Sequence, residues 1–120
     1  GVDLDGIDRS PSALGSKRRN RLSPHTSVGL RLMVSNAFNS GSFREGQWYA
    51  FGQFARRKVP KMAPKDISLL LHYFVMAGYN DPALYRLFVH TIKAKSERFG
   101  ATDIAISMNA LSRLPPSQRL

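Results

Sequence analysis

Basic side chains gather in two segments of this sequence, and both segments contain almost no acid. Residues 44–65 hold six cations against the single acid Glu45, and residues 11–25 hold four cations against none. The cations are Arg44, Arg56, Arg57, Lys58, Lys61 and Lys65 in the first segment, and Lys17, Arg18, Arg19 and Arg21 in the second. Guanidinium and ammonium groups donate charge-assisted hydrogen bonds to phosphate oxygens. The two clusters therefore predict binding to a polyanion, and nucleic acid is the obvious candidate.

The charge of the whole chain supports the same prediction. Its 120 residues hold 18 Lys and Arg against 8 Asp and Glu, which gives a formal net charge of +10. A field of that size attracts polyanions over a Debye length of about 8–10 Å. The candidate RNA-binding set consists of the clustered cations other than Arg44, together with Lys93, Lys95 and Arg98. For any single residue a plainer role stays open, since basic groups near a helix C-terminus also complement the helix dipole or form a solvated face.

Aromatic residues lie beside the first basic cluster and suggest stacking on bases. An exposed aromatic ring next to Arg stacks on single-stranded bases for roughly 1–3 kcal/mol each. Trp48 and Phe51 follow helical spacing with Ala55, so we expect them in the core instead. Tyr49 and Tyr79 are the better stacking candidates, because Tyr49 lies off that stripe and Tyr79 is expected in a turn between helices.

Residue patterns that support catalysis or metal binding are missing from the sequence. It contains no phosphate-binding glycine loop, no dinucleotide fingerprint, no H-E-x-x-H motif and no Cys, and its three histidines have no metal-ligand spacing. We therefore expect no catalytic residue, no metal, no cofactor and no small-molecule substrate, so the chain is predicted not to be an enzyme. No apolar run approaches the roughly 20 residues that span a bilayer, so no membrane span is expected either.

The helices expected to carry the basic side chains show an apolar pattern that repeats every 37 residues. Within each unit, apolar residues at i, i+4 and i+7 share one helical face. The three columns are Leu30, Ile67 and Ile104; Val34, Leu71 and Met108; and Ala37, Phe74 and Leu111. In a second element of each unit, Trp48 corresponds to Tyr85, Phe51 to Phe88 and Ala55 to Ile92. Two helices per unit, stacked as hairpins, is the simplest arrangement.

Prolines, glycines and acids mark where these helices begin and end. Pro64 and Pro82 suit a first helical turn, and Asp81 precedes Pro82 as an N-cap. Gly78 and Gly100 are expected to end helices, since glycine tolerates positive φ. The predicted helices are 27–39, 44–58, 64–77, 82–98 and 102–114, with Pro115-Pro116 stopping the last. The predicted fold is all-α, a short α-solenoid of helical hairpins over residues 26–116, with an extended basic N-terminal arm over 1–25 and a tail over 117–120.

The clearest unit also resembles a known family of helical repeats. Its landmarks are Ala63-Pro64-Lys65-Asp66-Ile67, Leu71, Tyr73-Phe74, Ala77-Gly78-Tyr79 and Asp81-Pro82-Ala83-Leu84-Tyr85. They resemble the heptatricopeptide and octotricopeptide repeats of organellar RNA-binding proteins, which often accompany a RAP domain and are related to FAST-kinase-like proteins. The resemblance covers about residues 28–114, but Asn39-Ser40-Gly41 and Arg44-Glu45 replace the landmarks in the first unit, and no RAP domain is visible.

The resemblance implies a mitochondrial matrix protein that acts on RNA. Similar repeats serve as subunits of the mitochondrial ribosome in parasites with fragmented ribosomal RNA, so a structural, rRNA-binding ribosomal protein that contacts neighbouring proteins of a large assembly is the leading expectation. A helical adaptor that binds protein, as an accessory subunit of another mitochondrial complex, is the alternative. Two further expectations concern the ends. The basic residues of the arm have a second explanation, a remnant of an organelle-targeting segment. The sequence ends within a repeat unit, so we expect it to be a piece of a longer protein.

Overall fold

The part of the chain that this computed structural model describes, residues 22–118, is built of helices, and no strand occurs in it. The five α-helices are α1 (Ser27–Asn39), α2 (Glu45–Lys58), α3 (Pro64–Met76), α4 (Pro82–Ala94) and α5 (Ala101–Ser112). Three single turns of 3₁₀-helix follow α2, α4 and α5: η1 (Val59–Lys61), η2 (Ser96–Arg98) and η3 (Pro116–Gln118). The prediction of an all-α fold is confirmed, and the predicted helices lie where the sequence placed them to within four residues.

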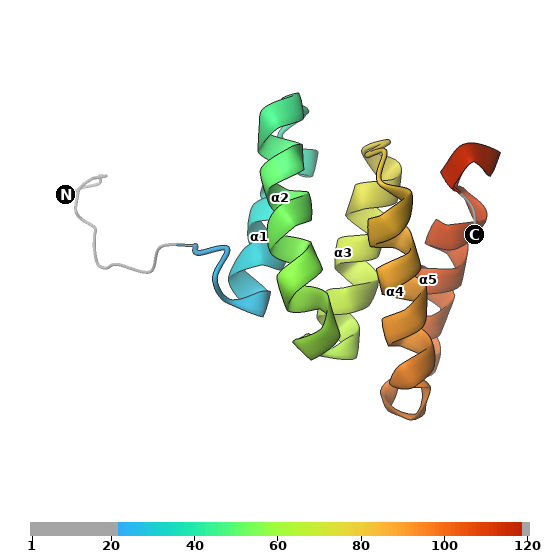
Figure 1. The fold of residues 1–120 in the computed structure, drawn as a ribbon. Helices are drawn as coiled ribbons and strands as arrows, with labels where there is room; N and C mark the ends of the chain where they lie inside the picture. The colour runs from blue at the N-terminus through green and yellow to red at the C-terminus, as the bar shows by residue number, and fades with distance from the viewer. Residues whose placement is uncertain (1–21, 119–120) are drawn as a thin grey trace.

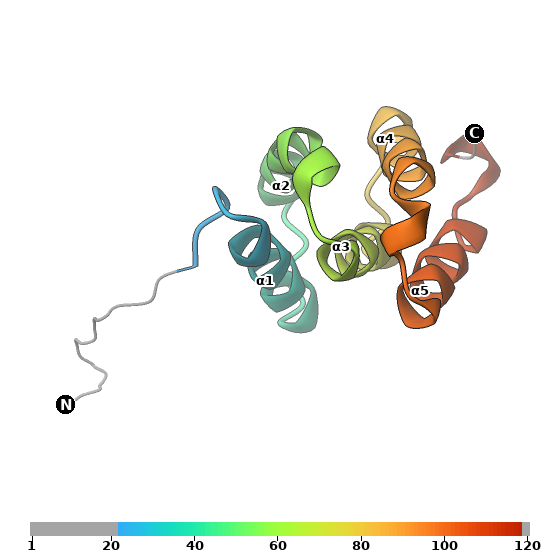
Figure 2. The same cartoon turned by 90° about the horizontal axis from the view of Figure 1, so that it is seen from below.

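The helices form two layers. Helices α1, α3 and α5 lie side by side in one layer, which we call the odd layer, and α2 and α4 lie across them in the even layer (Figure 2). Consecutive helices run in opposite directions, so the C-terminal ends of α2 and α4 lie at the same end of the molecule as the N-terminal ends of the odd helices (Figure 1). Helix α3 is central, because it packs against α1, α4 and α5.

Local capping and glycine turns explain several of the helix boundaries. The Asp81 carboxylate accepts a hydrogen bond from the Leu84 amide at 3.1 Å, and Pro82 follows in the first turn of α4, as predicted. Gly78 ends α3 with a φ of 74°, which glycine adopts without strain. Gly41 follows α1 with a φ of 75°, so the same turn occurs 37 residues earlier.

Two predicted boundaries were wrong. Gly100 does not end a helix: its φ is −78°, and it is the N-cap of α5. Helix α4 ends at Ala94 instead of reaching residue 98, because the backbone tightens into the 3₁₀ turn Ser96–Arg98. Such tightening satisfies carbonyls that the end of an α-helix leaves without partners.

The core lies between the two layers, and Phe74 is at its centre. This ring is fully buried and contacts Trp48 and Phe88 of the even layer, with ring centroids 5.7 and 6.2 Å apart. The predicted columns supply half of the other buried apolar side chains, namely Leu30, Val34, Ala37, Phe51, Ala55, Ile67, Leu71 and Tyr85. The stripe over residues 67–74 was therefore predicted correctly as a core face.

The stripe of the last helix was predicted incorrectly. Met108 is 60% exposed, and Ile104 and Leu111 are only half-buried. Helix α5 buries Ser107 and Ala110 instead, and it packs mainly on α3. Small side chains let two helices approach closely, so the larger apolar groups remain at the edge of the contact. Positions that are buried in α1 and α3 are therefore partly exposed in α5, the last helix of the odd layer.

Two polar contacts join the odd helices at corresponding positions. The Arg31 guanidinium donates to the Asp66 carboxylate between α1 and α3, and the Ser68 hydroxyl donates to Asp103 Oδ1 at 3.2 Å between α3 and α5. The donors are 37 residues apart, and so are the acceptors. Each junction of the odd layer thus places an acid of the next helix's first turn against a donor of the helix before it.

Candidate nucleic-acid interface

Formal charge is distributed very unequally between the two layers. The odd helices contain two cations and two anions, namely Arg31, Lys65, Asp66 and Asp103. The two even helices, with the N-cap of α4 and the turns that follow them, cover residues 45–61 and 81–98. These ranges contain eight cations, Arg56, Arg57, Lys58, Lys61, Arg86, Lys93, Lys95 and Arg98, against three anions, Glu45, Asp81 and Glu97. The fold therefore places every Lys and Arg of residues 45–98 except Lys65 in the even layer or its turns.

Most of these cations lie at the end where α2 and α4 finish and α3 begins (Figure 1). The Lys95 ammonium donates to the Met62 carbonyl at 3.0 Å, which ties the end of α4 to the loop after η1. Helix α4 also packs directly on η1. The residues of this basic end are Arg57, Lys58, Lys61, Lys65, Lys93, Lys95 and Arg98. Segments far apart in the sequence thus contribute to one positively charged surface, as the predicted set requires.

The cations of the basic end form no ion pair within residues 22–118, although the acid Glu97 lies among them in η2. Lys61, Lys65, Lys93 and Arg98 are exposed, and the ion pairs of the described residues are Arg31–Asp66 and Arg56–Asp81. Arg57 lies over the Phe54 ring, 5.1 Å from its centroid, which holds the guanidinium stem while leaving its donors toward solvent. These side chains are therefore free to meet an external anion.

Arg56 differs from its neighbours in the predicted set. Its Nη2 donates to both carboxylate oxygens of Asp81, at 2.7 and 2.9 Å. Asp81 is itself nearly buried and caps α4, so this pair joins α2 to the start of α4. Arg56 has a structural role in the folded chain, and we assign phosphate contact to its neighbours first.

Arg86 is a further cation of the even layer that was not among the predicted RNA-binding residues. It is exposed on α4 and lies seven residues before Lys93, so the two side chains share one face of the helix. The seven-residue spacing between Arg86 and Lys93 was enough to predict that the two side chains share a face. Lys17, Arg18, Arg19 and Arg21 of the predicted set lie outside the described residues.

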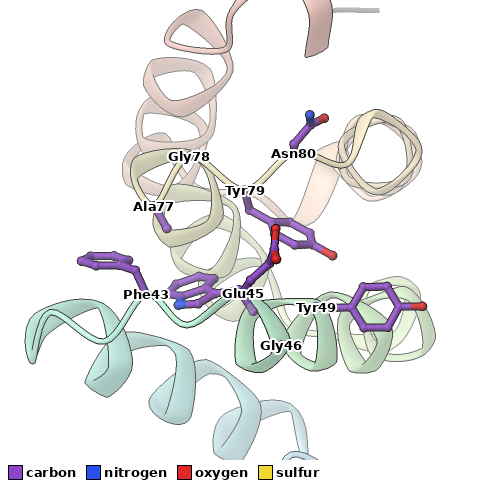
Figure 3. Close-up of a pocket in the computed structure, with 9 residues that line it drawn as sticks. Phe43, Glu45, Gly46, Tyr49, Ala77, Gly78, Tyr79 and Asn80 are labelled. Atoms are coloured by element: carbon purple, nitrogen blue, oxygen red, sulfur yellow. The ribbon is translucent and has the colours of Figure 1, made fainter.

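A pocket opens at the other end of α2 (Figure 3). It has a volume of about 650 Å³ and lies between the first turns of α2 and the turn from α3 to α4. Its lining residues are Phe43, Glu45, Gly46, Trp48, Tyr49, Ala77, Gly78, Tyr79 and Asn80. The structure therefore brings together Tyr49 and Tyr79, the two predicted stacking residues. Phe43 and Glu45 were not predicted, because their place depends on how the loop before α2 packs.

The rings of the pocket differ in exposure. Trp48 is buried, and its indole N–H donates to the Ser42 carbonyl at 2.8 Å, so this ring is fixed. Tyr49 is 61% exposed and Phe43 is 52% exposed. Burial and the nearby Asp81 carboxylate raise the pKa of Tyr79, which is half-buried against Gly52. Fixed and exposed aromatic surfaces therefore occur side by side at this end of α2.

No protein-family model, curated protein or solved structure matches the chain. The resemblance to organellar helical repeats thus stays a prediction. Within residues 22–118, no helix is long and apolar enough to cross a membrane. The same part of the chain contains no group of three or more His, Asp or Glu residues placed to hold a metal ion.

Proposed function

We propose that the chain is a structural RNA-binding subunit of a mitochondrial ribosome, built as a short α-solenoid of helical hairpins with a 37-residue repeat. Two pairs of features at this spacing support the repeat: the positive-φ turns at Gly41 and Gly78, and the contacts Arg31–Asp66 and Ser68–Asp103. Stacked hairpins offer an extended surface to a long partner instead of an enclosed cavity.

The observation that carries the RNA-binding proposal is the one-sided charge of the even layer. Residues 45–61 and 81–98 hold eight cations against three anions. Seven cations against two remain when the Arg56–Asp81 pair is set aside, which favours a polyanionic partner. Lys61 and Lys93, exposed on different segments of the basic end, give the surface the breadth to contact several phosphates. Contacts of this kind position an RNA and follow its shape, whereas they do not read its bases.

The mitochondrial ribosome enters the proposal through the resemblance of residues 63–85 to organellar repeats. Charge alone fits any RNA. A tagged copy of the chain, expressed in its own cells, should co-sediment with a mitochondrial ribosomal subunit, and ribonuclease digestion should release it. Sedimentation with another mitochondrial complex, insensitive to ribonuclease, would contradict the ribosomal assignment.

The odd layer favours a second candidate, a helical adaptor that binds protein. Its helices have no net formal charge, and Val28, Met76 and Met108 are exposed on them. A ribosomal subunit uses both properties, one side for RNA and one for neighbouring proteins. A pure adaptor has no use for the basic end.

A quadruple variant separates the two functions. Changing Arg57, Lys58, Lys61 and Lys93 to Gln should weaken binding to unrelated RNA sequences alike. The slope of log affinity against log salt should become shallower by roughly 0.7–0.9 for each phosphate that the variant no longer neutralises, so by about 3 in all. A comparison of two single variants, Lys93→Gln and Arg113→Gln, provides the control. Both remove one positive charge, but Arg113 is exposed at the end of α5, outside the even layer, so Arg113→Gln should change RNA affinity less.

The RNA-binding proposal fails if the quadruple variant keeps the affinity and the salt slope of the parent chain. If the variant instead stops binding a protein partner, the adaptor is the correct function.

A further inference from the structure

We infer that the pocket between α2 and the α3–α4 turn holds an unstacked guanine base of the bound RNA. The inference rests on the proposed function and adds base recognition to a surface that otherwise contacts phosphates. It assigns a ligand to the lining residues Phe43, Glu45, Tyr49 and Tyr79.

The rings of the pocket supply the stacking surfaces. Phe43 and Tyr49 expose more than half of their surface at its rim, and Tyr79 comes from the facing turn (Figure 3). Single-stranded RNA is commonly recognised by splaying a base onto such rings and hydrogen-bonding its Watson–Crick edge. A volume of about 650 Å³ accommodates one base with its sugar.

Glu45 is the group that selects among the bases. Its side chain is exposed in the first turn of α2, points toward the α3–α4 turn, and has no ion-pair partner within residues 22–118 (Figure 3). An ionised carboxylate accepts hydrogen bonds and donates none. Guanine presents two adjacent donors, N1–H and the N2 amino group, on its Watson–Crick edge. Adenine, cytosine and uracil each set an acceptor beside their donor, so only guanine binds both carboxylate oxygens.

The exposed face of α2 connects this pocket to the basic end. Tyr49, Gln53 and Arg57 follow one another at four-residue spacing, so they form one line along the helix. An RNA strand whose phosphates lie at the basic end can therefore follow α2 and deliver a base to Tyr49. The same charge disfavours the competing occupant, an arginine of a partner protein, because the even layer carries a net positive charge that repels a guanidinium.

The fluorescence of Trp48 can report the binding of free nucleotides. It is the one tryptophan of the chain and lines the pocket, so its fluorescence should change when a base enters. Titration with the four nucleoside monophosphates should give the tightest binding for GMP. A uridine oligonucleotide with one central guanine should bind at least about fivefold tighter than the all-uridine oligonucleotide.

Glu45→Gln tests the selectivity, because the amide keeps the shape but replaces one acceptor by a donor. It should abolish the guanine preference. Glu97→Gln is the matched control, since it removes the same charge from an exposed glutamate of η2 at the basic end, and it should leave the preference intact. Tyr49→Ala, at an exposed position, should weaken the guanine oligonucleotide at least about fivefold and the all-uridine oligonucleotide much less.

The outcomes distinguish the pocket from the RNA-binding proposal itself. Equal affinity for the two oligonucleotides, or a preference that survives Glu45→Gln, overturns the guanine site and leaves phosphate binding in place. If no oligonucleotide binds, the proposed function fails, and the GMP titration alone then decides whether the pocket takes the base. An arginine-containing peptide that changes Trp48 fluorescence while GMP does not assigns the pocket to a protein partner and overturns the inference.

Discussion

Alanine at two glycines of α2 should change the stability of the chain in opposite directions. A β-carbon at Gly46 would meet nothing within 4 Å, whereas one at Gly52 would lie 2.4 Å from the Tyr79 hydroxyl oxygen and 2.9 Å from its Cζ. Gly52 is therefore the space in which the Tyr79 ring sits. Gly46→Ala should stabilise the fold, and Gly52→Ala should destabilise it.

The magnitudes follow from two opposing terms. Glycine in a helix interior costs about 0.8–1 kcal/mol relative to alanine, and Gly46, which lies in the first turn, should return about half of that. Gly52→Ala gains the same propensity but must displace the Tyr79 ring, and overpacking of this kind costs about 1–3 kcal/mol. The two variants should therefore differ by about 1–2 kcal/mol in the free energy of unfolding.

Urea denaturation followed by circular dichroism measures both variants. The decisive control repeats Gly52→Ala in a Tyr79→Ala background, where the space is empty and the substitution should become stabilising by about 1 kcal/mol. If Gly52→Ala stabilises the parent chain as much as Gly46→Ala does, Tyr79 does not occupy this space and the wall of the pocket is wrongly placed.

Two further predictions concern the core and its titration. Phe74→Ala should cost about 3–5 kcal/mol of unfolding free energy because the ring is fully buried, whereas exposed Met108→Ala should stay within about 0.5 kcal/mol; similar losses in urea titrations would contradict the assigned core. Burial raises the pKa of Tyr85 above its ordinary value, so the unfolded chain releases this proton first, and stability should fall above about pH 10 by up to about 1.4 kcal/mol per pH unit. Thermal melts between pH 9 and 11 should show a shallower decline for Tyr85→Phe, and an unchanged decline would refute the assignment.

The helices were predictable because their ends are set by local chemistry. Asp81 and Pro82 start a helix through local interactions that do not depend on tertiary packing. Gly78 ends a helix because its φ is positive. The spacing of Ile67, Leu71 and Phe74 identified a core face for the same reason, since one helix fixes which side chains share a side.

The sequence could not show how the helices are placed relative to one another. Arg56 and Asp81 are 25 residues apart, and their ion pair depends on the offset between α2 and α4. Met108 occupies a position that is buried in the helices before it, but its exposure depends on what packs beside α5. The pocket was missed for the same reason: the loop residue Phe43 and the turn residue Tyr79 line one pocket only after both hairpins have packed.

The unequal charge of the two layers gives residues 22–118 an electric dipole. In the field of a polyanion such a molecule rotates before contact, so its even layer arrives first and most encounters begin in one orientation. The odd helices, which have no net formal charge, then face outward. On the proposed function, the bound chain covers phosphates with its even layer and presents its odd helices to neighbouring proteins in one orientation.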